Sequence, residues 1–175
     1  MQFLDPEDAL RQFGLYGAVD AADIGSGAGH FSLAAARRLE GGRLFAVDVE
    51  KDMLARLVSE ARERGLDNVH PIWGDAATHA GVPLSDASLD RAIVANTLFA
   101  VHDRDGLVRE VRRMIKPGGK VLVVDWVEDV AGGPHPHHRV TPDTVLGLFR
   151  KHGFEKTGDI DAGSHHYGMI FSVPN

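Results

Sequence analysis

The chain has 175 residues, of which 43% are hydrophobic and 25% are charged, a composition typical of one soluble globular domain. Nineteen Lys and Arg residues against 25 Asp and Glu residues give a net charge of −6, which argues against holding a nucleic-acid backbone through charge. No stretch has the roughly 18 consecutive apolar residues that a membrane span needs, and the N-terminus lacks the pattern of an export signal. The absence of cysteine excludes disulfides and thiolate metal sites. We therefore expect one domain, residues 1–175, in the cytoplasm.

Apolar runs that favour strands alternate with segments of helical periodicity, which is typical of βαβ units around a parallel sheet. In chain order, the pattern predicts a helix at about 6–13, a strand at 19–24, a helix at 31–39, a strand at 44–48, a helix at 53–61, strands at 69–73 and 89–95, a helix at 107–115, a turn at 116–119, a strand at 120–125, a helix at about 142–152 and strands at 154–160 and 167–173. Because Pro71 cannot donate to a sheet ladder, the strand that contains it is expected at or near a sheet edge.

The link after the first strand is rich in glycine and reads Gly25-Ser26-Gly27-Ala28-Gly29. Such a turn lets the backbone approach a ligand and leaves the N-terminus of the next helix facing it, although many glycine-rich turns serve packing alone. A dinucleotide-binding fingerprint requires a third small residue one position after Gly29, where this chain has His30. The spacing therefore disfavours NAD or FAD.

Two carboxylates follow later strands. Asp48 ends the second strand and could accept both hydroxyls of an adenosine ribose, with a helix N-cap as the alternative. Asp75, within Gly74-Asp75-Ala76, could accept a hydrogen bond from an adenine amino group, with a turn-forming role as the alternative. Met53 lies one helical turn past Asp48, where it would contact a purine face or belong to the core.

Together these motifs resemble those of the class I S-adenosylmethionine-dependent methyltransferases. The matching segments are Asp23 to Gly29, Val47 to Leu54, Gly74 to Ala76, Leu89 to Asn96 and Met114 to Lys120, so the resemblance covers about residues 18–125. It implies an α/β fold with a doubly wound, Rossmann-like sheet of seven strands, mostly parallel, with an antiparallel last strand. It also implies that S-adenosylmethionine is the cofactor and S-adenosylhomocysteine the product.

The resemblance assigns a set of cofactor-binding residues, namely Asp23, Gly25, Ser26, Gly27, Gly29, Asp48, Val49, Met53, Gly74, Asp75, Ala76 and Asn96. In this assignment the glycines cradle the methionine part, Asp48 holds the ribose and Asp75 contacts the adenine amino group. Ala76 offers its N–H to the ring, and Asn96 lies beside the methionine end, near the acceptor.

Within the family, the chain looks closest to the small-molecule branch related to quinone-biosynthesis methyltransferases. Those enzymes often have histidines shortly after the fourth strand, whereas residues 96–102 here read Asn-Thr-Leu-Phe-Ala-Val-His. They also usually carry longer N-terminal or inserted cap segments. The resemblance implies methyl transfer to a small organic acceptor by direct in-line displacement, which needs no cysteine nucleophile.

Histidines gather near the end of the chain, in a loop at 126–140 and at the start of the last strand. The members are His135, His137, His138, His165 and His166. We expect the loop to act as a lid on the acceptor side, followed by a closing helix and strand pair at 141–175. His138 and His166 are the candidate general bases, with Tyr167 as an orienting group, and turnover would then rise near about pH 6 to 7. The alternative is exposed histidines without a role; the spacing does not match a recognised metal site, so we expect no metal.

Other functions remain open from the sequence. A noncatalytic module that binds S-adenosylmethionine would carry the same cofactor motifs. RNA methylation is disfavoured by the acidic charge and by the lack of an appended binding domain. An oxidoreductase on a Rossmann-type fold is disfavoured by His30 and by the absence of a Tyr-x-x-x-Lys pair. The expected partner is a small-molecule acceptor, with no nucleic acid or membrane span, and a homodimer is compatible with the sequence.

Overall fold

The structure, a computed structural model, describes residues 4–175. The strands are β1 (Asp20–Ile24), β2 (Arg43–Asp48), β3 (Val69–Trp73), β4 (Leu89–Ala95), β5 (Ile115–Trp126), β6 (Glu155–Ile160) and β7 (His166–Ser172). The helices are α1 (Pro6–Phe13), α2 (His30–Arg38), α3 (Lys51–Glu63), α4 (Arg104–Met114) and α5 (Pro142–Lys151), with short 3-10 turns η1 (Leu98–Ala100) and η2 (Pro136–His138). No helix within residues 4–175 is long and apolar enough to span a bilayer.

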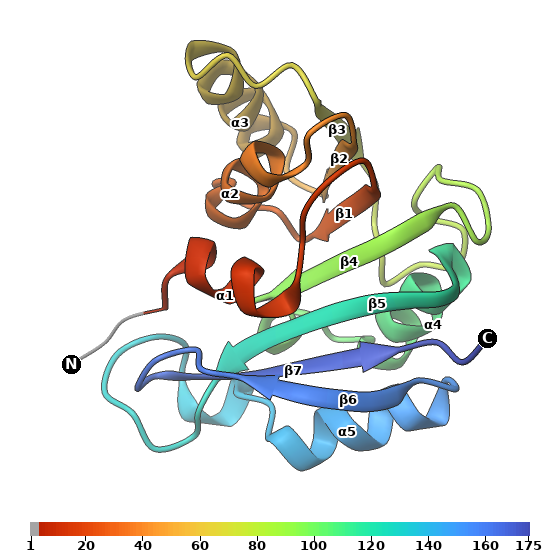
Figure 1. Cartoon of the computed structure of the whole chain (residues 1–175). Helices are drawn as coiled ribbons and strands as arrows, with labels where there is room; N and C mark the ends of the chain where they lie inside the picture. Colours follow the sequence, from red (N-terminus) through yellow and green to blue (C-terminus); the bar gives the residue numbers. More distant parts are fainter. Residues whose placement is uncertain (1–3) are drawn as a thin grey trace.

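The seven strands form one sheet in the order β3-β2-β1-β4-β5-β7-β6 (Figure 1). Strands β1 to β5 pair in parallel, whereas β7 lies antiparallel between β5 and β6. This arrangement confirms the predicted Rossmann-like, mostly parallel sheet with an antiparallel last strand. The strand with Pro71 is at the sheet edge, as the proline predicted.

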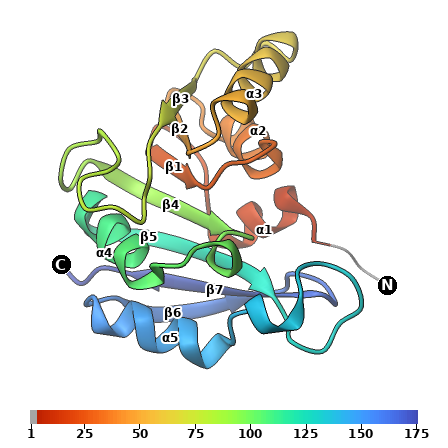
Figure 2. The same cartoon turned by 180° about the vertical axis from the view of Figure 1, so that it is seen from behind.

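Helices cover both faces of the sheet (Figures 1 and 2), because each helix buries one apolar side against the strands. Helices α1, α2 and α3 lie on one face, where Leu10, Phe13 and Leu39 are buried. Helices α4 and α5 lie on the other, where the stacked rings of Phe149 and Phe171 have centroids 4.3 Å apart. The ligand-binding edge of such a sheet is the carboxyl end of its parallel strands.

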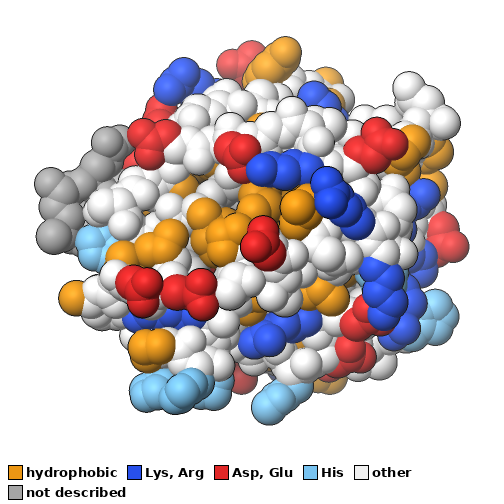
Figure 3. Space-filling model, turned by 90° about the horizontal axis from the view of Figure 1, so that it is seen from below, with side chains coloured by type: hydrophobic (Ala, Val, Ile, Leu, Met, Phe, Trp, Pro, Cys, Tyr) orange, Lys and Arg blue, Asp and Glu red, His pale blue; other side chains and the backbone are white. Residues whose placement is uncertain are grey.

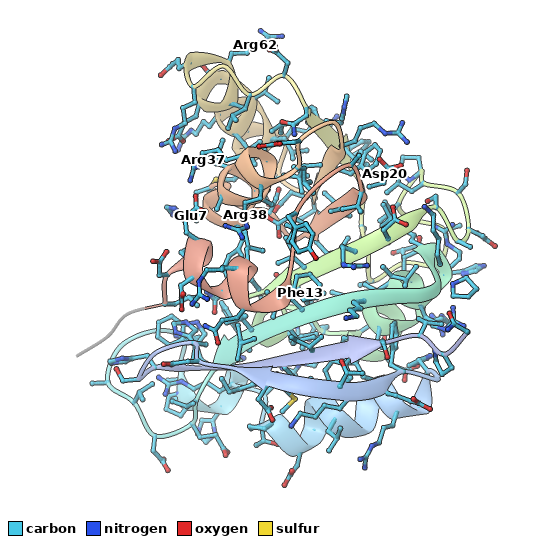
Figure 4. The ribbon with its side chains drawn as sticks, in the orientation of Figure 1. Glu7, Phe13, Asp20, Arg37, Arg38 and Arg62 are labelled. Carbon is cyan, nitrogen blue, oxygen red and sulfur yellow. The ribbon has the colours of Figure 1, made fainter. Side chains whose placement is uncertain are left out.

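The leading helix is fixed at both ends and along its side. The Asp5 side chain caps α1 by accepting a hydrogen bond from Glu7 N at 3.0 Å, as expected from the sequence. Glu7 forms ion pairs with Arg37 and Arg38 of α2, and Figure 4 shows these three side chains facing one another. Phe13 is buried beneath the helix. These contacts hold the start of α1 beside α2.

The segment predicted as a turn at 116–119 is assigned to β5, but it interrupts the ladder with β4, and regular pairing resumes at Lys120 as predicted. Helix α4 ends at Met114, and β5 begins directly at Ile115, which pairs with Leu89 of β4. The register between β4 and β5 shifts after Leu89, so the Pro-Gly-Gly segment is accommodated as an irregularity within the strand pair. Gly118, with φ +73°, supplies the left-handed backbone that this irregularity needs.

Candidate active site

Two adjoining pockets open at the carboxyl ends of β1 and β4, with Gly25 and Asn96 shared between them. The first pocket has a volume of about 250 Å³ and is lined by Ile24, Gly25, Val47, Asp48, Val49, Gly74, Asp75, Ala76, Ala77, Asn96, Thr97, Ala100, Val101 and Leu107. The second has a volume of about 490 Å³ and is lined by Leu4, Pro6, Asp23, Gly25, Ser26, Gly27, His30, Phe31, Ala95, Asn96, Trp126 and His166. Most of the predicted cofactor residues therefore lie around one continuous edge of the sheet.

Asp48 lies between the glycine-rich turn and the start of α3. Its Oδ2 accepts a hydrogen bond from Gly27 N at 2.7 Å, and its Oδ1 accepts one from Glu50 N at 2.9 Å. The N-cap of α3 is Glu50, so the alternative interpretation of Asp48 as the helix N-cap is wrong. Each oxygen of a carboxylate can accept more than one hydrogen bond, which leaves capacity for a ligand in the first pocket.

Asp75 has the turn-forming contacts that the sequence left open. Its Oδ1 accepts a hydrogen bond from Ala77 N at 2.9 Å, and its Oδ2 accepts one from the Thr78 hydroxyl at 3.1 Å. Asp75 also lines the first pocket, together with Gly74 and Ala76. The turn is thus preformed, and a contact of Asp75 with a purine stays a prediction.

The glycines of the turn have different surroundings. A Cβ atom on Gly27 would meet nothing within 4 Å, so this residue borders open space in the second pocket. A Cβ atom on Gly29 would lie 2.6 Å from Leu57 Cδ1, and Gly29 lines neither pocket. Gly29 therefore permits the packing of α2 against α3. Met53, on α3, also lines neither pocket and is 37% exposed.

Several buried polar atoms at the second pocket have no hydrogen-bond partner among residues 4–175. They are the Ser26 hydroxyl, Asn96 Oδ1 and both ring nitrogens of His166. Asn96 directly follows β4 in the left-handed conformation, with φ +53°, which asparagine tolerates better than most residues. Unpaired buried polar atoms are costly, so their grouping at one pocket provides hydrogen-bonding groups for a polar ligand.

Asp23 is a buried carboxyl on the wall of the second pocket. It accepts a hydrogen bond from the Ser32 hydroxyl at 2.6 Å. Burial raises the pKa of Asp23 to about 6, against the lowering effect of Ser32, and the negative charge of Asp48 adds a smaller rise. A cationic ligand group beside Asp23 would compensate this buried charge.

Trp126 and His166 form the far wall of the second pocket. They are opposite one another in the β5–β7 ladder, and their ring centroids are 4.3 Å apart. Burial lowers the pKa of His166 to about 4, and the neighbouring His165 contributes a smaller decrease. The imidazole is therefore neutral at pH 7, so a rise in turnover near pH 6 to 7 is not expected from this residue, contrary to the prediction.

The other predicted catalytic residues lie elsewhere. His138 belongs to η2 and lines a third pocket, so the expectation that His138 and His166 meet over one acceptor is wrong. The Tyr167 hydroxyl donates to the Val140 carbonyl at 2.7 Å, burial raises the pKa of Tyr167, and its side chain lines neither the first nor the second pocket. Tyr167 thus anchors the end of the 126–140 loop.

Sequence reasoning missed several wall residues. Thr97 is buried, and its hydroxyl donates to the Ile24 carbonyl at 3.0 Å, which joins β4 to β1 at the floor of the first pocket. Its position directly after Asn96 was an available signal. Leu4 and Pro6 reach the second pocket only through the packing of α1 on α2, for which no local pattern exists.

A family model described as a methyltransferase domain matches residues 21–119, more than half of the chain. The chain therefore belongs to the methyltransferase domain family, which confirms the resemblance to class I S-adenosylmethionine-dependent methyltransferases and the cofactor that it implies. The match spans the glycine-rich turn, Asp48, Asp75 and Asn96.

Curated relatives carry related names. The uncharacterized methyltransferase YcgJ of Bacillus subtilis is 33% identical over 133 residues, 74% of this chain and 45% of that protein. A demethylmenaquinone methyltransferase of Geobacillus sp. is 28% identical over 120 residues, 68% of this chain and 50% of that protein. The chain thus spans about half the length of these relatives.

Solved structures share the fold. A SAM dependent methyltransferase from Aquifex aeolicus has a TM-score of 0.89 at 24% identity, with 98% of this chain and 90% of that chain covered. The [4+2]-cyclase SpnF has a TM-score of 0.82 at 22% identity, with 97% of this chain and 80% of that chain covered.

Proposed function

We propose that this chain transfers a methyl group from S-adenosylmethionine to a small organic acceptor by direct in-line displacement. The observation that carries the proposal is the pair of pockets joined at Gly25 and Asn96. One pocket presents a carboxylate with spare acceptor capacity, and the other presents unpaired polar atoms.

The residues present fit the two ends of the cofactor. In the first pocket, Asp48 would accept the ribose hydroxyls, and the Asp75 carboxylate and Ala76 N–H would contact the adenine. In the second, the unpaired Ser26 hydroxyl and Asn96 Oδ1 would bind the amino-acid end. The cofactor supplies a methyl group that is already activated by a sulfonium.

Asp23 would balance the ammonium of the cofactor. Its carboxyl is buried beside the second pocket, and the only side-chain hydrogen bond that it accepts among residues 4–175 comes from Ser32. A cation there would favour the charged form of the carboxyl and lower its pKa. The amino-acid end would thus be fixed by charge as well as by hydrogen bonds.

The acceptor would occupy the remainder of the second pocket. Leu4, Pro6, Phe31 and Trp126 give this space an apolar lining that excludes water and suits a planar organic molecule. The neutral imidazole of His166 has two unpaired nitrogens, one of which would accept a proton from an acceptor hydroxyl or carbon acid. Hydroxylated aromatic and quinol compounds are the first acceptor class to test, since curated relatives act in quinone methylation by name.

The test is a screen of such acceptors that follows S-adenosylhomocysteine formation. We expect at least one planar hydroxylated acceptor to be methylated, with turnover lowered in His166→Ala while affinity for S-adenosylhomocysteine is retained. Binding of S-adenosylhomocysteine without turnover on any acceptor would contradict methyl transfer.

A second candidate is a domain that binds S-adenosylmethionine without transferring its methyl group. The structural similarity to a cyclase favours keeping this candidate, because one fold supports several chemistries. The same screen separates the two candidates, since only a transferase forms S-adenosylhomocysteine. A cytoplasmic location and a homodimer stay predictions from the sequence.

A further inference from the structure

A third pocket of about 460 Å³ lies between η1 and the loop at 126–140. Its lining consists of Phe99, Ala100, Val101, His102, Arg104, Pro134, His135 and His138. None of these eight residues is acidic, although acidic residues outnumber basic ones in the chain as a whole. Figure 3 shows histidine side chains grouped at the margin of the lower face. The pocket thus combines one guanidinium, three imidazoles and an apolar floor.

Arg104 forms no ion pair with a carboxylate among residues 4–175. Its Nε donates to the Leu98 carbonyl at 2.8 Å and its Nη2 to the His138 carbonyl at 3.2 Å, and both acceptors are uncharged backbone groups. The adjacent acids are engaged elsewhere, because Asp103 caps α4 through Gly106 N and Asp105 pairs with Lys151. The guanidinium therefore keeps donor capacity for a ligand.

The charges of the buried Asp125 and Arg104 interact, so Asp125 offsets part of the guanidinium's charge without occupying its donor groups. Burial raises the pKa of Asp125 to about 6, and the charge of Arg104 is a minor influence that lowers it. No ion pair joins the two side chains in the part of the chain that the structure describes. Asp125 instead accepts a hydrogen bond from Trp126 N at 2.8 Å.

The loop that forms one wall is held in shape by Arg139, a buried residue. Its guanidinium donates to five backbone carbonyls, those of Val127, Glu128, Val130, Gly132 and Pro134, at 2.6 to 3.0 Å. Tyr167 anchors the end of the loop at Val140. These bonds give the loop a defined shape, and a preformed site loses less entropy when a ligand binds.

The donor groups of the pocket select the sign of the ligand's charge. The rings of His135 and His138 are 6.3 Å apart, edge to face, and imidazole N–H groups can donate beside the Arg104 guanidinium. Arginine recognises carboxylate and phosphate groups by paired hydrogen bonds. Phe99 and Pro134 would contact an apolar body. Within residues 4–175, no group of three or more His, Cys, Asp or Glu side chains is arranged to hold a metal ion.

We propose that the third pocket binds a small organic anion, with its carboxylate or phosphate on Arg104 and its apolar body against Phe99. The pocket shares Ala100 and Val101 with the first pocket, so the ligand would lie next to the cofactor site. This inference does not depend on the proposed methyl transfer.

Calorimetric titration with benzoate tests the proposal, and benzamide serves as the uncharged probe of the same shape. S-Adenosylhomocysteine is present at saturation to occupy the cofactor part of the first two pockets, and the variants below separate binding in the third pocket from binding in the rest of the second. We expect saturable binding of one benzoate per chain and binding of benzamide that is weaker by about tenfold or more, since the lost interaction is charge-assisted. Absence of saturable benzoate binding, or equal binding of both probes, would overturn the proposal.

Two variants locate the site. His135→Glu places a carboxylate on an exposed position of the pocket, and Arg104→Met removes the cation. Each should weaken benzoate binding by about tenfold or more, whereas Arg109→Met, an exposed position on α4 outside the pocket, should change it less than about twofold. Because His135 is exposed, its variant tests the site even where Arg104→Met fails to fold. Unchanged affinity in His135→Glu would overturn the assignment.

The design also separates this proposal from the proposed function. Failure of S-adenosylhomocysteine to bind would contradict the cofactor assignment, and the benzoate titration would then be repeated without it. The effect of His135→Glu would still report on the third pocket alone, because His135 lines neither the first nor the second pocket.

Discussion

The buried carboxyl of Asp23 should make the affinity for S-adenosylhomocysteine depend on pH. Burial raises the pKa of Asp23 to about 6 in the free protein. Pairing with the ligand ammonium favours the carboxylate, so the pKa falls in the complex and a proton is released on binding. Taking the bound pKa as well below 5, linkage predicts affinity about tenfold weaker at about pH 5 than at about pH 7.5.

Substitution Asp23→Asn keeps the shape and removes the titration. Its affinity for S-adenosylhomocysteine should be lower than that of the wild type at about pH 7.5 and flat down to about pH 5. Asp125→Asn is the matched control, because burial also raises the pKa of Asp125 to about 6 but this residue lines neither of the first two pockets. The control should keep the tenfold dependence.

Asp23→Asn should lower the affinity for S-adenosylhomocysteine but raise the stability of the protein without ligand. Since the folded pKa of Asp23 is raised from 3.8 to about 6, its contribution to stability is fully present below about pH 3.8 and is lost as the pH rises through about 6. Without ligand, Asp23→Asn should therefore increase the free energy of unfolding above about pH 6, by about 3 kcal/mol at 1.36 kcal/mol per pKa unit. Calorimetry from about pH 5 to 7.5 and denaturant unfolding provide both readouts. A wild type with pH-independent affinity, or an Asn variant that keeps the dependence, would refute the reasoning.

Three further predictions concern other site residues. Asp48→Ala should weaken S-adenosylhomocysteine binding more than Asp75→Ala, because Asp48 can accept two ribose hydroxyls and each lost bond to a charged acceptor costs about 1.5 to 3 kcal/mol; equal losses in calorimetry would show the roles to be misassigned. His166→Ala should lower turnover on an identified acceptor, whereas His138→Ala should leave it unchanged. The wild-type rate should show no inflection from His166 near pH 6 to 7, because burial lowers the pKa of His166 to about 4. The reverse pattern in steady-state rates would place the base in the third pocket. Gly29→Ala should destabilise the fold by about 2 to 4 kcal/mol through overlap with Leu57 and backbone strain, whereas Gly27→Ala should mainly weaken ligand binding. Thermal unfolding measures the first effect and calorimetric titration the second. A Gly29→Ala variant as stable as the wild type would contradict the packing role.

The order and type of the elements were predictable because they depend on local patterns. Asp5 and Pro6 predicted the start of α1, and Pro71 predicted an edge strand, both from backbone chemistry that acts within a few residues. The start of β5 was not predictable in this way, because pairing of Ile115 with Leu89 depends on a partner distant in the chain.

Some residues of the candidate site were also predictable from local patterns, and others were not. Ser26, Asp48 and Asn96 lie at or just after the carboxyl ends of strands, where topology alone brings residues to one edge, and all three line the first two pockets. The separation of His138 from His166 could not be predicted, because it depends on how the 126–140 loop wraps around Arg139. The contacts of Arg139 within its own loop fix the shape of that loop, and no local pattern predicts this shape.

The measurement that tests the account most directly is a calorimetric titration of the purified chain with S-adenosylhomocysteine, S-adenosylmethionine and NADH. The account predicts micromolar binding of both methionine derivatives at one site, weakened in Asp48→Ala, and no binding of NADH. Binding of NADH without binding of either methionine derivative would contradict the assignment of these pockets to S-adenosylmethionine.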